Sequence, residues 1–199
     1  MSIRIATEQD LLQILAIYAP YVEKTTISFE YAPPTPEVFR QRFLTITERF
    51  PWLVWEEQEE ILGYAYACAP FERAAYQWCA EPSIYLLPQA QGKGIGRKLY
   101  EVLHEILTAQ GYRLSYAIIT SENEASLAFH RALGYKEIAQ FPGCGYKFGK
   151  HLGVTWMEKS LVSVDTPMNP PVSFPIFVEN ARKIPAFLGK LSLPQTEKI

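Results

Sequence analysis

Apolar residues recur along the first half of the chain in two periods, one of two residues and one of three to four, which predict strands and helices in turn. Helical spacing follows the capping sequence Thr7-Glu8-Gln9-Asp10 and ends near Pro20. Thr35 and Pro36 begin a second helix, which ends at Pro51. The strands predicted in this half are residues 2–6, 52–56, 61–71 and about 77–87, and the last three form an antiparallel meander.

The second half continues with the same two periods. A glycine-rich segment precedes an amphipathic helix that ends at Gly111. A buried strand then leads to the capping box Ser121-Glu122-Asn123-Glu124 and a short helix that ends at Gly134, and two last strands are joined by Pro142-Gly143-Cys144-Gly145. These strands are residues 112–120, 135–141 and 154–159. The order β-α-α-β-β-β-α-β-α-β-β predicts a mixed α/β sheet.

The composition is that of a soluble globular protein, with 48% hydrophobic and 20% charged residues in a chain of 199. A net charge of −2 and a pI near 6.0 give no broad basic surface, so we expect no nucleic-acid partner. No apolar run approaches the ~18 residues of a membrane span, and the N-terminus is not signal-like. We therefore expect a cytoplasmic protein without a membrane partner.

Cysteine usage points the same way. Cys68, Cys79 and Cys144 are odd in number and form no C-x-x-C pair, which suits a reducing compartment. Their spacing is not that of metal ligands, so we expect no metal site.

The segment Gln91-Gly92-Lys93-Gly94-Ile95-Gly96 precedes the amphipathic helix. Its glycines let backbone N–H groups approach a ligand, and the helix N-terminus adds a positive dipole end, so a diphosphate fits here. Spacing alone fits an ordinary tight turn equally well. The glycine pattern is not the dinucleotide fingerprint, and Lys93 is not followed by the Ser or Thr of an ATPase phosphate loop.

Q-x-x-G-x-G in this segment resembles the acetyl-CoA pyrophosphate loop of the GNAT superfamily of N-acyltransferases, and the element order is similar to the GNAT fold over residues 2–161. Four stretches resemble its phosphinothricin N-acetyltransferase branch. They are Ala75-Tyr76-Gln77-Trp78 with Glu81, Ser83-Ile84-Tyr85-Leu86 with the glycine segment, residues 123–135, and Gly145-Tyr146-Lys147-Phe148-Gly149. The chain departs from the branch at His151 and Gly153, where members generally carry Trp and Asp.

The resemblance implies an α/β domain with the GNAT fold over residues 1–161, in which helices flank a mixed, mostly antiparallel sheet. It implies an enzyme that uses acetyl-CoA to acetylate the amino group of a small amino-acid-like substrate, of the phosphinothricin or methionine sulfone type, and that forms a homodimer. Two hypotheses stay open beside it. One is a protein or peptide N-acetyltransferase, and the other is a domain that binds acyl-CoA without catalysis, which the departures at His151 and Gly153 motivate.

Transfer from a thioester to an amine needs a bound coenzyme, a neutral amine and a proton for the leaving thiolate. The resemblance assigns the coenzyme to a strand, the glycine segment and the start of the next helix. These residues are Ile84, Tyr85, Leu86, Gln91, Gly92, Lys93, Gly94, Ile95, Gly96, Asn123, Ser126 and His130. Lys93 fits a solvated residue as well, and Asn123 and Ser126 fit an N-cap.

Glu81 and His130 are the predicted catalytic residues. Glu81 matches the family's catalytic base, which takes the proton of the acceptor ammonium, although its position also fits an exposed edge carboxylate. His130 lies where many GNAT enzymes carry a Tyr acid, and imidazole can donate a proton to the thiolate. It also fits a packed helix residue or a coenzyme contact.

Four further residues are predicted to bind the acceptor. Arg73 and Tyr76 match branch residues that bind a substrate carboxylate, which a guanidinium fork suits. Lys147 could add a second positive contact, and Phe29 could form a wall of the acceptor pocket.

Residues 162–199 form an extension that the family does not explain. Six of the 15 prolines lie there, which excludes a long helix, yet the segment is too apolar for a free linker. We expect it to pack on its own domain or on a second subunit, with at most a short helix near residues 178–183.

Overall fold

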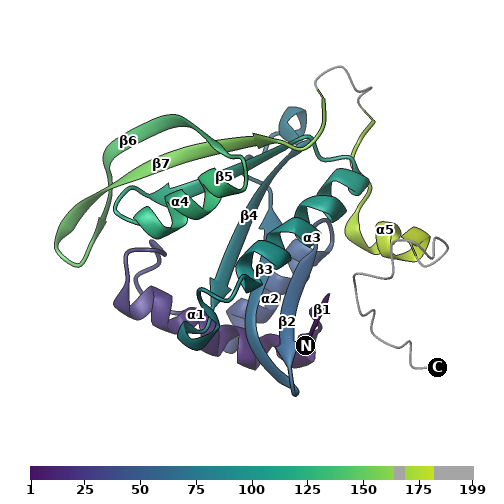
Figure 1. Ribbon diagram of the computed structural model, residues 1–199, viewed down its shortest axis with the longest axis horizontal. Coiled ribbons are helices and arrows are strands. Elements are labelled where there is room, and N and C mark those ends of the chain that lie inside the picture. Colours follow the sequence, from purple (N-terminus) through teal and green to yellow (C-terminus); the bar gives the residue numbers. More distant parts are fainter. Residues whose placement is uncertain (164–168, 182–199) are drawn as a thin grey trace.

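The computed structural model describes residues 1–163 and 169–181. Its centre is a seven-stranded sheet in the order β1-β2-β3-β4-β5-β7-β6 (Figure 1). The strands are β1 (Ser2–Ile5), β2 (Trp52–Glu57), β3 (Glu60–Cys68), β4 (Cys79–Leu86), β5 (Leu114–Thr120), β6 (Lys136–Lys147) and β7 (Lys150–Ser160). All neighbours are antiparallel except β4 and β5, which are parallel. The predicted element order and mixed α/β sheet are confirmed.

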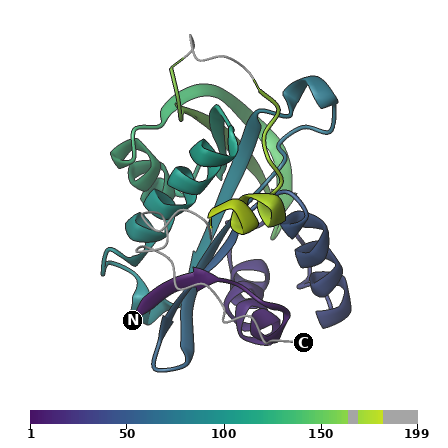
Figure 2. The ribbon, with the colours of Figure 1, turned by 90° about the vertical axis from the view of Figure 1, so that its right-hand side faces the viewer.

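Helices cover both faces of the sheet (Figure 2). They are α1 (Leu11–Lys24), α2 (Pro36–Thr47), α3 (Ile95–Gln110), α4 (Glu124–Ala132) and α5 (Phe174–Ala181). The continuous apolar run of β2 explains why two layers form, because its residues are buried alternately on opposite faces. Leu53 packs in the cluster with α3 and α4, whereas Trp52 and Val54 pack with α1 and α2.

The sheet divides between β4 and β5. These strands pair only at Cys79 with Leu114 and at Ala80 with Ser115. Beyond this junction β4 continues to Leu86 along β3, and β5 continues along β7, so the two strands diverge (Figure 1). The divergence leaves backbone donors and acceptors of both strands facing an opening, which begins at Glu81.

Two predicted boundaries are wrong. Helix α1 continues four residues past Pro20 to Lys24, because Val22 is fully buried and its packing outweighs the hydrogen bond that Pro20 cannot make. Residues 142–145 do not join two strands, since β6 runs through them with a register shift between Phe141 and Gly145. The chain instead turns at residues 148–149.

The starts of α2 and α4 lie close to the predicted positions. The Thr35 hydroxyl accepts the N–H of Val38, as expected for an N-cap followed by Pro. At α4 the cap is Asn123, whose side chain accepts the N–H of Ser126, rather than a capping box that starts at Ser121.

The described part of the extension lies against the C-terminal end of α3 (Figures 1 and 2). The Gln110 side chain donates to Val172 O at 2.8 Å, and Trp78 Nε1 donates to Asn169 O at 2.8 Å. Phe174 is 5% exposed and joins the core beside α3. Helix α5 begins four residues before the predicted helix near 178–183, and the predictions for residues 164–168 and 182–199 lie outside the described residues. No helix in the described ranges is long and apolar enough to cross a membrane.

Candidate active site

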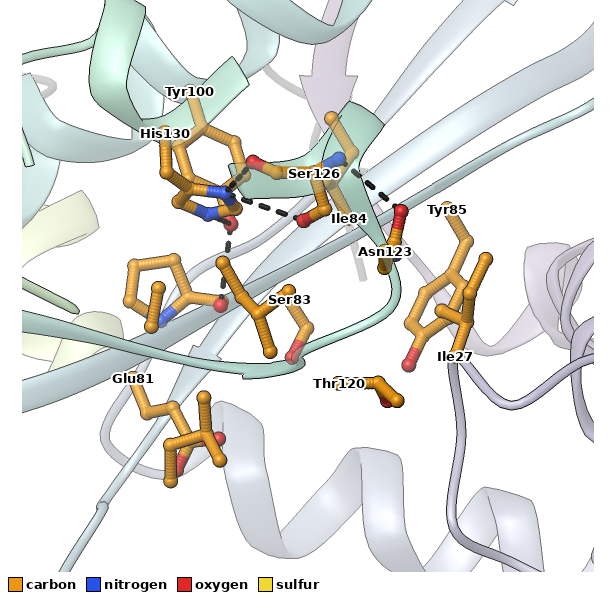
Figure 3. A pocket seen from close by; sticks show the side chains of 14 residues that line it. Ile27, Glu81, Ser83, Ile84, Tyr85, Tyr100, Thr120, Asn123, Ser126 and His130 are labelled. Atoms are coloured by element: carbon orange, nitrogen blue, oxygen red, sulfur yellow. Dashed lines mark hydrogen bonds between the residues drawn. The ribbon is translucent and has the colours of Figure 1, made fainter. Parts of the chain in front are cut away.

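A pocket lies in the opening between β4 and β5 (Figure 3). Strand β4 lines it with residues 81–85, and β5 lines it with residues 117–120. The other lining residues are Ile27 from the segment after α1, Tyr100 from α3, and Asn123, Ser126 and His130 from the start and body of α4. Five of the predicted coenzyme residues, together with Glu81, therefore meet in one place.

Glu81 is the first residue of β4 beyond the junction. Its neighbour Ala80 packs in the core beside α3, so the Glu81 side chain points to the opposite face of the sheet, where Cys68 is its partner on β3. Burial raises the pKa of the Glu81 carboxyl to about 7. A carboxyl with this pKa can accept a proton near neutral pH, which suits a general base.

His130 is 3% exposed and held from both ring nitrogens. Its Nδ1 lies 2.8 Å from Ser126 O, which only accepts, so Nδ1 carries the hydrogen and donates it. Nε2 is then an acceptor for the Tyr100 hydroxyl at 3.2 Å. Burial lowers the pKa of His130, so the ring is neutral and its one hydrogen is already bonded.

Tyr100 links three elements at this point. Its hydroxyl lies 3.2 Å from Pro82 O on β4 and 3.2 Å from His130 Nε2 on α4 (Figure 3). Figure 3 shows Glu81 well apart from this pair. The site thus has a carboxyl on one face of β4 and a hydroxyl–imidazole pair on the other face. Sequence analysis missed Tyr100, because a tyrosine inside an amphipathic helix has the pattern of a packing residue.

The glycine segment leaves open space for a ligand. Gly92 and Gly94 have φ of 71° and 79°, and a Cβ at either position would meet nothing within 4 Å. Gly94 is the N-cap of α3, whose first N–H groups have no partner within the helix. The backbone here therefore has the conformation, the donors and the room that a diphosphate needs. Lys93 is exposed beside it, whereas Ile95 and Gly96 are buried against the core.

Gln91 is held by a contact that the sequence did not show. Its Nε2 donates to the Tyr21 hydroxyl at 3.1 Å, and that hydroxyl donates to Leu86 O at 2.5 Å. Tyr21 thus ties the end of β4 to the start of the glycine segment. The side chains of Ile84 and Leu86 pack against the core, and Tyr85 packs on Tyr21. Ile84 and Tyr85 line the pocket, whereas Leu86 does not.

Arg73 and Tyr76 lie in the loop before β4 and do not line the pocket. Both are exposed. The loop is fixed on the far half of the sheet by Phe71, whose ring lies 4.7 Å from Tyr76, 5.8 Å from Tyr116 and 5.9 Å from Trp156. The structure therefore places them beside the junction rather than inside the pocket.

Lys147 and Phe29 lie outside the pocket as well. Lys147 is 2% exposed, and its Nζ donates to the carbonyls of Val22, Thr25 and Ser28 at 2.7, 2.9 and 2.7 Å. An ammonium has three hydrogens, so none is left for a substrate, and the expected contact of Lys147 with the acceptor finds no support here. Phe29 packs over Gly145, and Ile27, two residues earlier, lines the pocket instead.

The departures at His151 and Gly153 lie on β7 and do not line the pocket, and Gly153 O accepts the N–H of Ser121, which follows the pocket residue Thr120. His151 is exposed beside Tyr146, with ring centroids 5.1 Å apart. A Cβ on Gly153 would lie 3.1 Å from Ser121 Oγ. Among the described residues, no group of three or more His, Cys, Asp or Glu could hold a metal ion.

Comparison with known proteins identifies the family to which this chain belongs. The family sequence model described as the acetyltransferase (GNAT) domain matches residues 3–156, so the chain belongs to the GNAT acetyltransferases. The predicted fold and the predicted acetyltransferase activity are confirmed.

Within this family the chain is similar to the phosphinothricin N-acetyltransferase branch, as predicted. It is 34% identical to phosphinothricin N-acetyltransferase of Streptomyces coelicolor over 165 residues, which covers 81% of this chain and 96% of that protein. It is 38% identical to L-methionine sulfoximine/L-methionine sulfone acetyltransferase of Pseudomonas aeruginosa, with 80% and 94% covered. A crystal structure of a GNAT superfamily phosphinothricin acetyltransferase from Sinorhizobium meliloti in complex with AcCoA has a TM-score of 0.82 and 36% identity, with 86% and 94% covered.

Proposed function

We propose that the protein transfers the acetyl group of acetyl-CoA to the α-amino group of a small amino-acid-like acceptor, of the phosphinothricin or methionine sulfone type. The observation that carries this proposal is Glu81, a carboxyl with a raised pKa of about 7 at the opening between two diverging strands. The names of the relatives, which act on phosphinothricin or methionine sulfone, support the acceptor class.

Residues of this chain fit acetyl-CoA. The open backbone at Gly92 and Gly94 would hold the diphosphate, with Lys93 beside it. The free edge of β4 from Ile84 to Leu86 would pair with the amides of the pantetheine arm, and Asn123 and Ser126 would approach it from α4. A thioester bound in this way supplies an acetyl group that an amine can attack.

Glu81 would take one proton from the acceptor ammonium, which makes the nitrogen nucleophilic. When the C–S bond breaks, the sulfur needs a proton. We assign donation to the Tyr100 hydroxyl, which burial keeps protonated by raising its pKa well above the usual value. Its hydrogen, directed at Pro82 O or His130 Nε2 in this structure, would turn to the sulfur, with His130 orienting the hydroxyl. The second proton lost by the attacking nitrogen balances the one that the sulfur takes, and solvent returns it to Tyr100.

The acceptor carboxylate would bind at Arg73 and Tyr76. Support comes from the branch resemblance and from the packing of Phe71, which holds this loop beside the junction where Glu81 begins the opening. Acceptors of this class carry one carboxylate, and Arg73 offers a matching fork of donors.

A coenzyme-release assay over amino acids, phosphinothricin, methionine sulfone and short peptides tests the proposal. We expect turnover with the free amino-acid-like compounds and little with peptides. Release of CoA with peptides alone would favour a peptide N-acetyltransferase. Tight acetyl-CoA binding without turnover on any amine would favour a binding domain.

We also propose a homodimer in the cytoplasm. Strand β6 is an edge of the sheet and exposes Ile138, Phe141 and Tyr146, which supports a second copy at this edge. The cysteines of the described residues are free, which supports a reducing compartment. Light scattering that gives the mass of a monomer at micromolar concentration would contradict the dimer, and fractionation of cells that express the protein tests the location.

A further inference from the structure

Residues 25–31, here called the brace, connect the two diverging halves of the sheet. The brace begins at the end of α1, which packs against β3 and β4. It then meets the other half at two strands: Thr120 Oγ1 on β5 donates to Thr26 O at 2.6 Å, and the Tyr31 hydroxyl donates to Tyr146 O on β6 at 2.9 Å. Between these contacts, Ile27 lines the pocket (Figure 3).

Lys147 holds the brace from β6. Its three hydrogens go to one carbonyl in the last turn of α1, Val22 O, and two in the brace, Thr25 O and Ser28 O. Carbonyls at a helix C-terminus lack intrahelical partners and attract a cation. No ion pair of Lys147 occurs within residues 1–163 and 169–181, so these carbonyls, with the Phe148 ring 4.9 Å from Nζ and the charge of Glu30, compensate the burial of its charge.

Further contacts fix the middle of the brace. The Ser28 hydroxyl is hydrogen-bonded to Tyr18 Oη at 2.8 Å, and Glu30 accepts from Arg42 of α2 at 2.5 Å. The Phe29 ring covers Gly145, where a Cβ would lie 2.2 Å from the ring. The brace is thus docked on α1, α2 and β6, and these contacts hold the segment that carries Ile27 at the pocket.

We propose that Lys147 is a positioning residue that sets the wall of the pocket at Ile27, and through this wall the fit of the acceptor, by fixing the brace across the opening between β4 and β5. This inference rests on the proposed function, because it takes the pocket as the place where the acceptor amine meets the thioester. Lys147 acts on the acceptor through the position of Ile27, without touching the acceptor carboxylate.

The decisive variant is Lys147→Met, which keeps an unbranched side chain one heavy atom shorter and removes its three hydrogen bonds. Buried carbonyls left without donors are costly, so the KM of the acceptor should rise roughly tenfold or more. The rise should be equal for an amino acid and for its carboxamide. A rise confined to the amino acid would show a direct carboxylate contact and overturn the proposal.

Lys150→Met is the matched control. Lys150 begins β7 after the same turn and is exposed, so this variant should keep the acceptor KM within about twofold. An unchanged acceptor KM in Lys147→Met would also overturn the proposal.

Hydrogen exchange of the brace amides gives a readout that needs no acceptor. It should quicken at least tenfold in Lys147→Met and stay unchanged in Lys150→Met, whatever amine the enzyme prefers. Slow exchange in Lys147→Met would overturn the inference while leaving the proposed function intact. If Lys147→Met does not fold, Thr120→Val and Tyr31→Phe each remove one anchor of the brace, and both should raise exchange and the acceptor KM together. No change in either variant would count against the brace.

Discussion

Burial at single residues decides most of the chemistry in this pocket. Glu81 lies where β4 leaves β5, and loss of water raises the pKa of its carboxyl to about 7. A base must be ionised to accept a proton, so activity should rise with pH until about 7 and then level off.

Glu81→Gln should lower kcat/KM by roughly 10²–10⁴-fold, because general base catalysis is lost. Titration of the acceptor affects both enzymes equally, so it drops out of the ratio of variant to wild-type kcat/KM. This ratio should fall as pH rises from 5 to 7, because only the wild type gains activity as Glu81 ionises. A ratio that is the same at every pH would remove Glu81 from the base role.

The same substitution should change stability in a pH-dependent way. A raised carboxyl pKa means that the fold favours the protonated form, so its contribution is present below about 4.5 and is lost as pH rises through about 7. Glu81→Gln should therefore raise the Tm more at pH 8 than at pH 5, as calorimetry can measure.

Tyr100→Phe tests the proton donor. The variant removes one hydroxyl from the Pro82–His130 contact, and kcat should fall on the order of 100-fold with little change in the KM of acetyl-CoA. Tyr135→Phe is the control, since it removes a buried hydroxyl bonded to Ser115 and His104 on the same side of the sheet. If Tyr100→Phe keeps kcat within twofold, the proton must come from His130 or water.

At the scale of elements, the glycine segment and α3 form one binding unit. Gly94 has φ of 79°, which costs other residues about 1–2 kcal/mol, and a side chain here would enter the open space. Gly94→Ala should raise the KM of acetyl-CoA about tenfold or more. Gly143→Ala is the control, because Gly143 has φ of 70° with equal room but lies in the β6 bulge. If Gly94→Ala and Gly143→Ala have the same KM for acetyl-CoA, the glycine segment does not bind the coenzyme.

The sequence predicts elements where the signal is local. Thr35 with Pro36 defines the start of α2, and the glycine segment before α3 predicts an anion site because each depends on adjacent residues. The turn predicted at residues 142–145 is wrong, because Pro and Gly favour a turn, whereas pairing with β7 on both sides, at Phe141 and from Gly145, keeps these residues within β6 as a bulge. Tertiary contacts decide such cases.

The site residues also divide into those with a local sequence signal and those defined by tertiary contacts. Glu81 was predicted from its place in a motif, and the structure brings it to the pocket. The sequence does not predict Tyr100, and it predicts Lys147 as an acceptor contact rather than a brace contact, since their partners come from residues 18 to 125 positions away. A lysine in a sequence predicts an exposed charge, and only the fold brings three carbonyls to it.

At the scale of the whole molecule, the extension completes the core beside α3. Phe174→Ala should cost about 3 kcal/mol, which for a chain of this size lowers the Tm by roughly 6–12 °C. Ile176→Ala is the control, because Ile176 is 53% exposed and should change the Tm little. Differential scanning calorimetry measures the Tm of both variants. If Phe174→Ala has the same Tm as Ile176→Ala, Phe174 does not pack in the core. We expect kcat/KM at 25 °C to stay unchanged in both variants.

Strands β4 and β5 pair at only two residue pairs, and the extension binds the side chain that directly precedes each strand. Trp78 donates to Asn169 O, and Arg113 donates to Ser163 O. An enzyme shortened before Ser163 would keep every reacting group. It would lose the two hydrogen bonds, one from Trp78 and one from Arg113, that flank the junction between β4 and β5. Because the cut also removes the core residue Phe174, warming should end turnover at a lower temperature than in the full chain, so the extension would set the working range of the enzyme rather than its chemistry.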